Sequence, residues 1–358
     1  SVIAEALKDP VAGIRENAIR LAELHLASAP QLSDALFGLQ SDPNPKVRFQ
    51  LLLTLGFVNT PQSIKTRNKL LFEDINDKWV QVAALSAGSE TSSLLKVVLE
   101  KFRPDVPAYS SLVERLTSMI GVTGDADRIY ELIQKATTKV NDENTKSHVA
   151  ILEGLSRGLR NRKSSLTISL NLQKRLIEAF FENNSSRMRN ASYHVLKVQG
   201  ITEDALKDQS IKKALSIIKD STQKADKRAD AIDFLSLGDP SSYVAILEKL
   251  LVPHEQSVVQ LAAVRTLNLV KDISVSQYII QQWPELTPEI RDAAISIFMH
   301  QPDRVNLLLN AMEKGIISPT SVSFWASVGL MMQSDSTLRQ RARVIFTRSQ
   351  EEGKKINE

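Results

Sequence analysis

The sequence contains no cysteine, which excludes a disulfide framework, a thiolate metal site, a cysteine nucleophile and a covalently attached c-type haem within the chain. Aromatic residues make up 5% of the total and glycine occurs 13 times, too few for an all-β sandwich or barrel. No apolar run reaches the roughly 18 residues that suggest a membrane-spanning helix. These absences favour a helical chain without membrane insertion.

A large excess of charge is also absent, because 45 Lys and Arg face 41 Asp and Glu, for a net charge of +4. So small and dispersed an excess does not predict nucleic-acid binding. Apolar residues reach 42%, enough to bury a core. The chain opens on SVIAEALKDP with neither an initiator methionine nor a charged-then-apolar leader. We therefore expect a fragment of a larger multidomain protein, whose targeting signal lies outside these residues.

A repeated pattern organises the chain. Asp-Pro followed by an aliphatic-Arg pair occurs in DPVAGIRENAIRLAEL and again in SDPNPKVRFQLLLTLG, with Arg15 and Arg48 lying 33 residues apart. The aliphatic-Arg pair recurs later in the chain, mostly at intervals of 31 to 39 residues. In some copies Gln replaces the Arg, and in one copy Lys replaces the aliphatic residue. These later copies are Val80-Gln81, Met188-Arg189, Lys227-Arg228, Val259-Gln260, Ile290-Arg291 and Leu338-Arg339. With weaker amphipathic segments between Gln81 and Arg189, the period predicts about ten repeats.

Each repeat holds two helical patterns, which we name the A helix and the B helix. Apolar residues at helical spacing mark the B helix most clearly in two sets: Val47, Leu51, Leu52 and Leu55, and Ile290, Ala294, Ile297 and Phe298. Asn44 before Pro45, and Thr287 before Pro288, predict N-caps. Left-handed helix ends are expected at five glycines: Gly56, Gly88, Gly121, Gly200 and Gly238.

A pair of short helices cannot bury its apolar face alone, whereas stacked pairs can. The sequence therefore predicts an all-α fold: an α-solenoid, or superhelix, of about ten HEAT-like helical-hairpin repeats. We expect it to form one elongated, monomeric domain over residues 1–358.

The repeated charged residues allow two interpretations. They could form a stripe that binds phosphates or acidic peptides. Alternatively, each guanidinium could donate a bidentate bond to an acid of its own or the next turn and so fasten the stack. We favour the second interpretation and name the set the Asp/Arg ladder; its members are Asp9, Arg15, Asp42, Arg48, Arg189, Arg228, Arg291 and Arg339.

A second cluster of charge lies in the segment SRGLRNRKSS. It contains Arg157, Arg160, Arg162 and Lys163, which we name the basic patch. Cations at a helix end complement the helix dipole and are usually solvated. A docking surface for a neighbouring domain is the alternative interpretation.

No arrangement in the sequence predicts a catalytic, cofactor-binding or metal-binding residue. The histidines are far apart, whereas metal ligands lie at short spacing; they are His25, His148, His194, His254 and His300. No Gly-x-Ser-x-Gly elbow or glycine-rich phosphate loop is present. Trp79, Trp283 and Trp325 have apolar sequence neighbours and are expected in the core.

Five stretches in order resemble one protein family across nearly the whole chain. They are DPNPKVRFQLLLTLG, DKWVQVAALSA, AILEGLSRGLR, LLVPHEQSVVQLAAVRTL and QQWPELTPEIRDAAISIFMHQPDRVNLLLNAMEKGIISP. Together they resemble the HEAT-repeat region of large secreted bacterial proteins described as membrane-bound dehydrogenases, which occur in Planctomycetes, Verrucomicrobia and Bacteroidetes. In that family a sugar-dehydrogenase-like β-propeller precedes the repeats, and a c-type cytochrome domain with a Cys-x-x-Cys-His motif follows them.

The resemblance implies a role rather than a site, because the family's redox modules lie outside these residues and no catalytic position carries over. It implies a periplasmic or cell-envelope scaffold whose partners are the flanking propeller and cytochrome c domains. Two other functions stay open. One is a cytoplasmic HEAT adaptor that binds acidic peptides or nucleic acid; the other is a hydrolase or HEAT-like DNA glycosylase, which a strongly basic concave face would favour.

Overall fold

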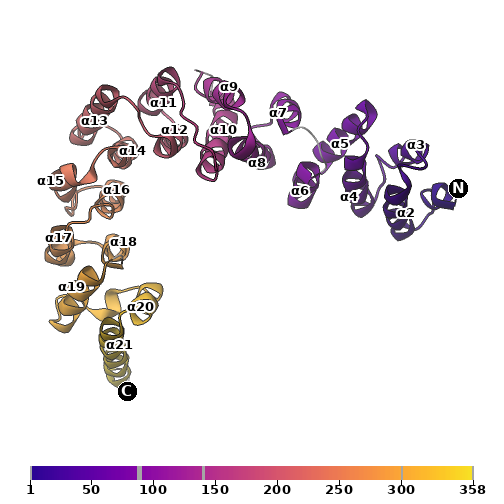
Figure 1. The fold of residues 1–358 in the computed structure, drawn as a ribbon. Coiled ribbons are helices and arrows are strands. Elements are labelled where there is room, and N and C mark those ends of the chain that lie inside the picture. The colour runs from indigo at the N-terminus through magenta and orange to yellow at the C-terminus, as the bar shows by residue number, and fades with distance from the viewer. Residues whose placement is uncertain (1, 87–90, 139–141, 300, 357–358) are drawn as a thin grey trace. The chain divides into compact units, whose positions relative to one another are not determined.

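The computed structural model describes residues 2–86, 91–138, 142–299 and 301–356 (Figure 1). Within these ranges the protein consists of 21 α-helices and five short 3₁₀ helices, and no strand occurs there. Gly88 and His300 lie outside the described residues. The predicted all-α fold is confirmed.

The helices alternate between A and B types along the chain, as the repeat pattern predicts. The A helices are α1 (Val2–Ala6), α3 (Leu32–Phe37), α5 (Pro61–Glu73), α7 (Thr91–Glu100), α9 (Ala126–Ala136), α11 (Leu170–Glu182), α13 (Asp204–Lys219), α15 (Val244–Glu248), α17 (Ser274–Gln282) and α19 (Pro302–Glu313). The B helices are α2 (Ala12–His25), α4 (Pro45–Thr54), α6 (Lys78–Ser86), α8 (Pro107–Thr123), α10 (Asp142–Arg160), α12 (Ser186–Gln199), α14 (Ala225–Phe234), α16 (Ser257–Leu267), α18 (Pro288–Met299) and α20 (Phe324–Met331). A last helix, α21 (Ser336–Ile356), packs against α19 and α20.

Short 3₁₀ helices lie beside several of these helices. They are η1 (Leu55–Phe57), η2 (Leu235–Leu237), η3 (Pro240–Tyr243), η4 (Trp283–Glu285) and η5 (Pro319–Ser321).

The helix pairs stack within two compact units. Unit 1 comprises residues 1–182 and 194–199, and unit 2 comprises 183–193 and 200–358, so that α12 contributes to both. In unit 1 the B helices α2, α4, α6, α8 and α10 pack in succession, and in unit 2 α14, α16, α18 and α20 do the same. Each unit is thus a layer of B helices backed by A helices, the packing of an α-solenoid (Figure 1). The prediction of one elongated domain over 1–358 is not decided by this division and stays a prediction.

The B helices bury the faces that the periodicity predicts. All eight apolar positions of the two marker sets are at most 1% exposed. Their burial removes one stripe of each helix from water, which is the main favourable term in stacking the pairs.

Helix starts follow the sequence more closely than helix ends do. The Asn44 side chain accepts a bond from the Lys46 amide at 2.9 Å, so the predicted N-cap of α4 is confirmed. Gly200 has the predicted positive φ, +76°. Gly56, Gly121 and Gly238 do not, because among the described residues positive φ occurs only at Gly200 and Gly315. The prediction for those three glycines is wrong.

Gly121 has a packing role instead, at the contact between α8 and α10. A Cβ atom on Gly121 would lie 2.9 Å from the Gly158 Cα atom. A Cβ on Gly158 would clash with the Ser118 carbonyl, and one on Gly154 with the Thr117 hydroxyl. The glycines in GLSRGL therefore let the two helices approach closely.

Candidate functional site

In unit 1 the first arginine–acid pairs of the Asp/Arg ladder join consecutive repeats. Arg15, in α2, donates from Nε and Nη2 to the two carboxylate oxygens of Asp42, at 2.6 and 2.8 Å. Its Nη1 donates to the main-chain carbonyls of Asp9 and Pro10. One guanidinium thus holds the turn of its own repeat and the turn of the next, in a charge-assisted bidentate geometry.

The next repeat uses the same arrangement. Arg48 donates from Nε and Nη2 to Asp74, both at 2.8 Å, and from Nη1 to the Asp42 carbonyl at 2.8 Å. At the third position Gln81 replaces arginine, and its amide donates to the carbonyls of Ile75 and Ala108. A neutral side chain therefore makes the corresponding link.

In unit 2 the acid-paired ladder arginines are more deeply buried than those of unit 1. Arg189, 2% exposed, donates from Nε to Asp230 at 2.6 Å and from Nη2 to Asp226 at 2.8 Å. Arg228 makes a bidentate pair with Glu255, at 2.9 and 2.8 Å. Both guanidinium groups also bond main-chain carbonyls of the preceding turn or helix end.

Two ladder arginines depart from the predicted acid pairing. Arg291 donates to the carbonyls of Trp283 and Pro284 and lies over the Trp283 ring. Arg339 donates from Nη1 to the carbonyls of Gln333 and Ser334. For Arg291 the cause is local sequence, because residues 314–323, after α19, contain no acid.

Asp9 is a further correction, because its carboxylate does not pair with Arg15. Its Oδ1 accepts a bond from the Val11 amide at 2.8 Å, and only its main-chain carbonyl binds Arg15. Asp9 therefore shapes the turn before α2.

The ladder acids differ in pKa according to burial. Burial opposes ionisation of Asp42, but the bonds from Arg15 and the Asn44 amide outweigh it and lower the pKa of Asp42 below its ordinary value. Arg228 lowers the pKa of Glu255 against burial in the same way. At Asp230 burial prevails, and its pKa is raised despite the Arg189 cation.

The basic patch separates into two parts. Arg157 pairs with Glu114, in the middle of α8, at 3.3 Å. Arg162, just beyond α10, donates to the carbonyls of Gly121 and Gly124 at the end of α8. Both side chains therefore connect the C-terminal region of α10 to α8. Arg160 and Lys163 are exposed. Docking through this pair stays a prediction.

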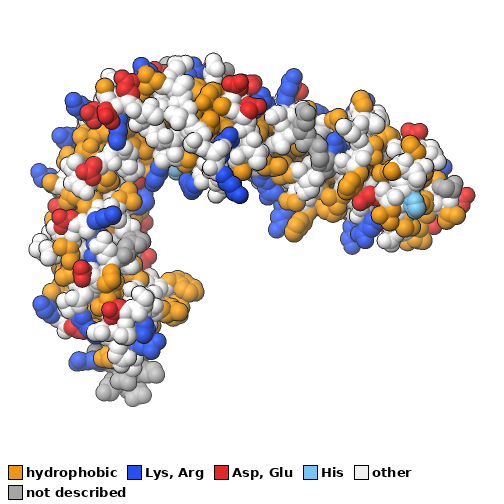
Figure 2. Space-filling model, in the orientation of Figure 1, with side chains coloured by type: hydrophobic (Ala, Val, Ile, Leu, Met, Phe, Trp, Pro, Cys, Tyr) orange, Lys and Arg blue, Asp and Glu red, His pale blue; other side chains and the backbone are white. Residues whose placement is uncertain are grey.

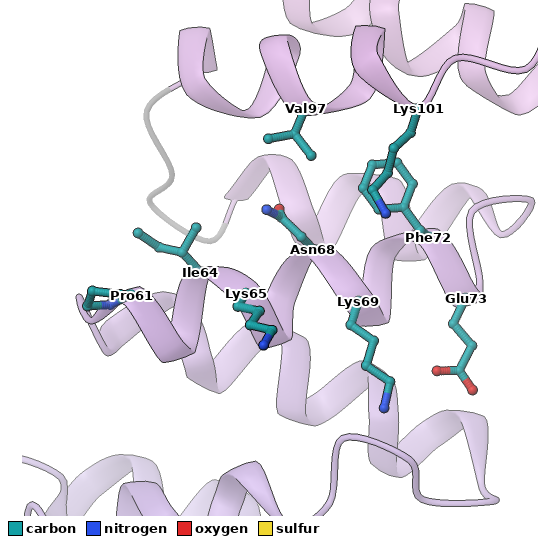
Figure 3. A pocket seen from close by; sticks show the side chains of 9 residues that line it. All are labelled: Pro61, Ile64, Lys65, Asn68, Lys69, Phe72, Glu73, Val97 and Lys101. Carbon is teal, nitrogen blue, oxygen red and sulfur yellow. The ribbon is translucent and has the colours of Figure 1, made fainter.

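A groove of about 920 Å³, here named the α5–α7 groove, opens between those two A helices of unit 1 (Figure 3). Its apolar side chains are Pro61, Ile64 and Phe72 from α5 and Val97 from α7. The Phe72 ring stacks on Tyr109, with centroids 6.0 Å apart and planes inclined by 19°. The buried Tyr109 thereby holds the floor of the groove in place.

Polar side chains rim this floor. Lys65, Asn68, Lys69 and Glu73 extend from α5, and Lys101 lies just beyond α7 with its Nζ 5.0 Å from the Phe72 ring centroid (Figure 3). The sequence prediction missed this site. The signal that could have found it is a second apolar stripe on α5, formed by Pro61, Ile64 and Phe72, apart from the buried face that holds Leu70 and Leu71.

Tryptophan placement was predicted correctly only once. Trp283 is 3% exposed, but Trp79 is 62% exposed and Trp325 is 80% exposed. Trp325 packs edge-to-face against Phe324 at the start of α20, where Figure 2 shows apolar side chains on the surface. The exposed rings of Trp79 and Trp325 lie outside the core and can contact other molecules.

Sequence reasoning also missed the buried Arg304 in α19. It is 1% exposed and donates from Nη2 to the carbonyls of Val270 and Asp272, before α17. Arg304 thus links α19 to the turn that precedes α17. Its position inside an otherwise apolar stripe of α19 is the signal that could have revealed it.

Metal-binding and membrane-spanning features are absent from the described residues. In the part of the chain that the structure describes, no group of three or more His, Cys, Asp or Glu side chains could hold a metal ion. The described helices include none with the length and hydrophobicity of a membrane-spanning segment.

Comparison with known proteins yields structural similarities only. No family model and no curated protein matches the chain. An engineered protein is similar over 97% of this chain and 98% of its own, with 14% identity and a TM-score of 0.37. The crystal structure of Kap121p is similar over 96% of this chain but only 36% of its own, with 14% identity and a TM-score of 0.44. Because the identities are 14% and the TM-scores are 0.37 and 0.44, these similarities carry no argument. The assignment of the fold rests on the helix packing described above.

Proposed function

We propose that this chain is a non-catalytic HEAT-repeat scaffold and protein-interaction module. The observation that carries the proposal is that the repeated arginines bind acids of neighbouring repeats. Arg15, Arg48, Arg189 and Arg228 each bond an acid contributed by a later turn or helix. The most regular feature of the sequence therefore serves the stacking of repeats, which leaves the groove and the exposed aromatic rings as surfaces for partners.

We further propose that the parent protein is an extracytoplasmic, dehydrogenase-like protein with a cytochrome c domain. The support is the ordered resemblance of five sequence stretches, combined with a chain built of stacked helix pairs. The partners would then be the flanking propeller and cytochrome domains, and the scaffold would set their separation.

The experiment uses the purified chain and the two flanking domains, each produced separately. The chain alone should not oxidise sugars or alcohols in the presence of an artificial electron acceptor, and it should retain at least one domain in a pull-down. Turnover by the chain would contradict the non-catalytic role. Failure of both domains to bind would contradict the docking role.

A further inference from the structure

The α5–α7 groove has the dimensions of a short peptide site. Its floor runs from Ile64 to Phe72, and the eight helical steps between them correspond to about 12 Å along the axis. That length accommodates about four residues of an extended chain or two turns of a helix. Ile64 is 44% exposed, and Val97 reaches toward α5 from the opposite wall (Figure 3). Such a floor favours an apolar anchor side chain.

The charge of the rim is strongly one-sided. Lys65, Lys69 and Lys101 face a single acid, Glu73, which lies 4.0 Å from Arg48 and is partly neutralised by it. Lys69 donates to the Ser41 hydroxyl at 2.7 Å, a neutral partner. Among the described residues none of these lysines forms an ion pair. The rim therefore attracts negative charge that the described part of unit 1 does not supply.

Asn68 adds a hydrogen-bonding group at the centre of the floor. It is half-buried, lies between Ile64 and Phe72 on one face of α5, and its amide makes no hydrogen bond to any described residue. A carboxamide offers both donors and an acceptor, so it can bond the N–H and C=O of a bound main chain. A floor with such a group suits a peptide better than a purely apolar ligand.

We propose that the α5–α7 groove binds a short acidic segment of a partner protein, with an apolar side chain seated on Phe72 and Val97 and carboxylates facing Lys65, Lys69 and Lys101. This inference rests on the proposed interaction role and specifies the chemistry of the partner. The apolar residue supplies burial, and the carboxylates supply orientation and selectivity.

The test is fluorescence anisotropy with the full chain and a fluorescein-labelled peptide of two leucines flanked on both sides by aspartates. The peptide should bind saturably, and salt should weaken binding. The variant K65E/K69E should lower the affinity about tenfold or more, because two attractions become repulsions. The control K174E reverses another exposed lysine, on α11 and outside the groove, and should leave the affinity unchanged.

Two further arms define the outcome. Substituting serine for the leucines, or Ile64→Ser in the protein, should also weaken binding, since each removes apolar contact. Unchanged affinity in K65E/K69E, or equal binding of a peptide with lysine in place of aspartate, would overturn the inference. Tighter binding of a short single-stranded oligonucleotide at the same site would assign the groove to nucleic acid instead.

The flanking domains separate this inference from the proposed function. If the flanking domains bind the wild-type chain and K65E/K69E equally well, while the peptide binds neither protein, the scaffold role stands and the groove assignment is wrong. If the domains bind the wild-type chain but not K65E/K69E, the groove is their docking site. Circular dichroism should show the same helix content in each variant, because both lysines are exposed.

Discussion

Replacing Arg189 by methionine is expected to be more destabilising than the same replacement at Arg15 or Arg48. Their side chains are 12% exposed, against 2% for Arg189. The arginine donates to Asp226, Asp230 and two main-chain carbonyls. In R189M the Asp230 side chain, which is 7% exposed, loses the bond from arginine and keeps the one from the Ser186 hydroxyl, at 3.0 Å. Breaking a buried pair in this way costs about 3 to 5 kcal/mol, because one charge is left without compensation.

The penalty should depend on pH with a defined sign. Burial already raises the pKa of Asp230, and loss of the Arg189 cation raises it further. The folded variant then holds a proton that the unfolded chain releases, so its free energy of unfolding increases as pH falls through the raised pKa. The deficit of R189M relative to the wild type should be largest near about pH 8 and smaller near about pH 5.

Urea denaturation followed by circular dichroism at several pH values measures this deficit. The double variant R189M/D230L should recover much of it, since apolar residues replace both charges. A deficit below about 1 kcal/mol, the same deficit at every pH, or a double variant no more stable than R189M would refute the reasoning.

Two other changes test the fold, each by urea denaturation. D42N should lower the free energy of unfolding by about 1 to 2 kcal/mol at neutral pH, and because the Asp42 pKa is lowered, the difference should disappear as pH falls through that value. A penalty that persists in acid would contradict the Arg15 pairing. G158A should cost about 1 to 3 kcal/mol because its Cβ meets the Ser118 carbonyl, whereas G13A, with nothing within 4 Å, should not destabilise. Equal effects of the two substitutions would contradict close packing of α8 on α10.

The repeat, the helix pairs and the buried B-helix faces could be predicted because they depend on local patterns. Val47 and Leu51 lie one helical turn apart, and only one orientation of α4 buries both. The Asn44 cap likewise follows from two adjacent residues. Such features require no knowledge of how distant repeats are spaced.

The remaining features depend on neighbours that the local sequence does not specify. Arg291 carries the ladder pattern, but its partner depends on a turn roughly a repeat away that lacks an acid. Trp79 and Trp325 are apolar by type, although their side of the helix leaves them exposed. The α5–α7 groove exists because two A helices leave space between them, and helix periodicity does not fix that distance.

The most direct test of the claim that ladder pairs fasten successive repeats is a double-mutant cycle on Arg48 and Asp74. R48M, D74N and R48M/D74N would be compared with the wild type by urea denaturation, with Arg103 and Asp105, whose side chains are 63% and 68% exposed, as the control pair. The ladder predicts a coupling free energy of about 1 kcal/mol or more for Arg48–Asp74 and none for the control. A coupling for Arg48–Asp74 within about 0.3 kcal/mol of zero would contradict it.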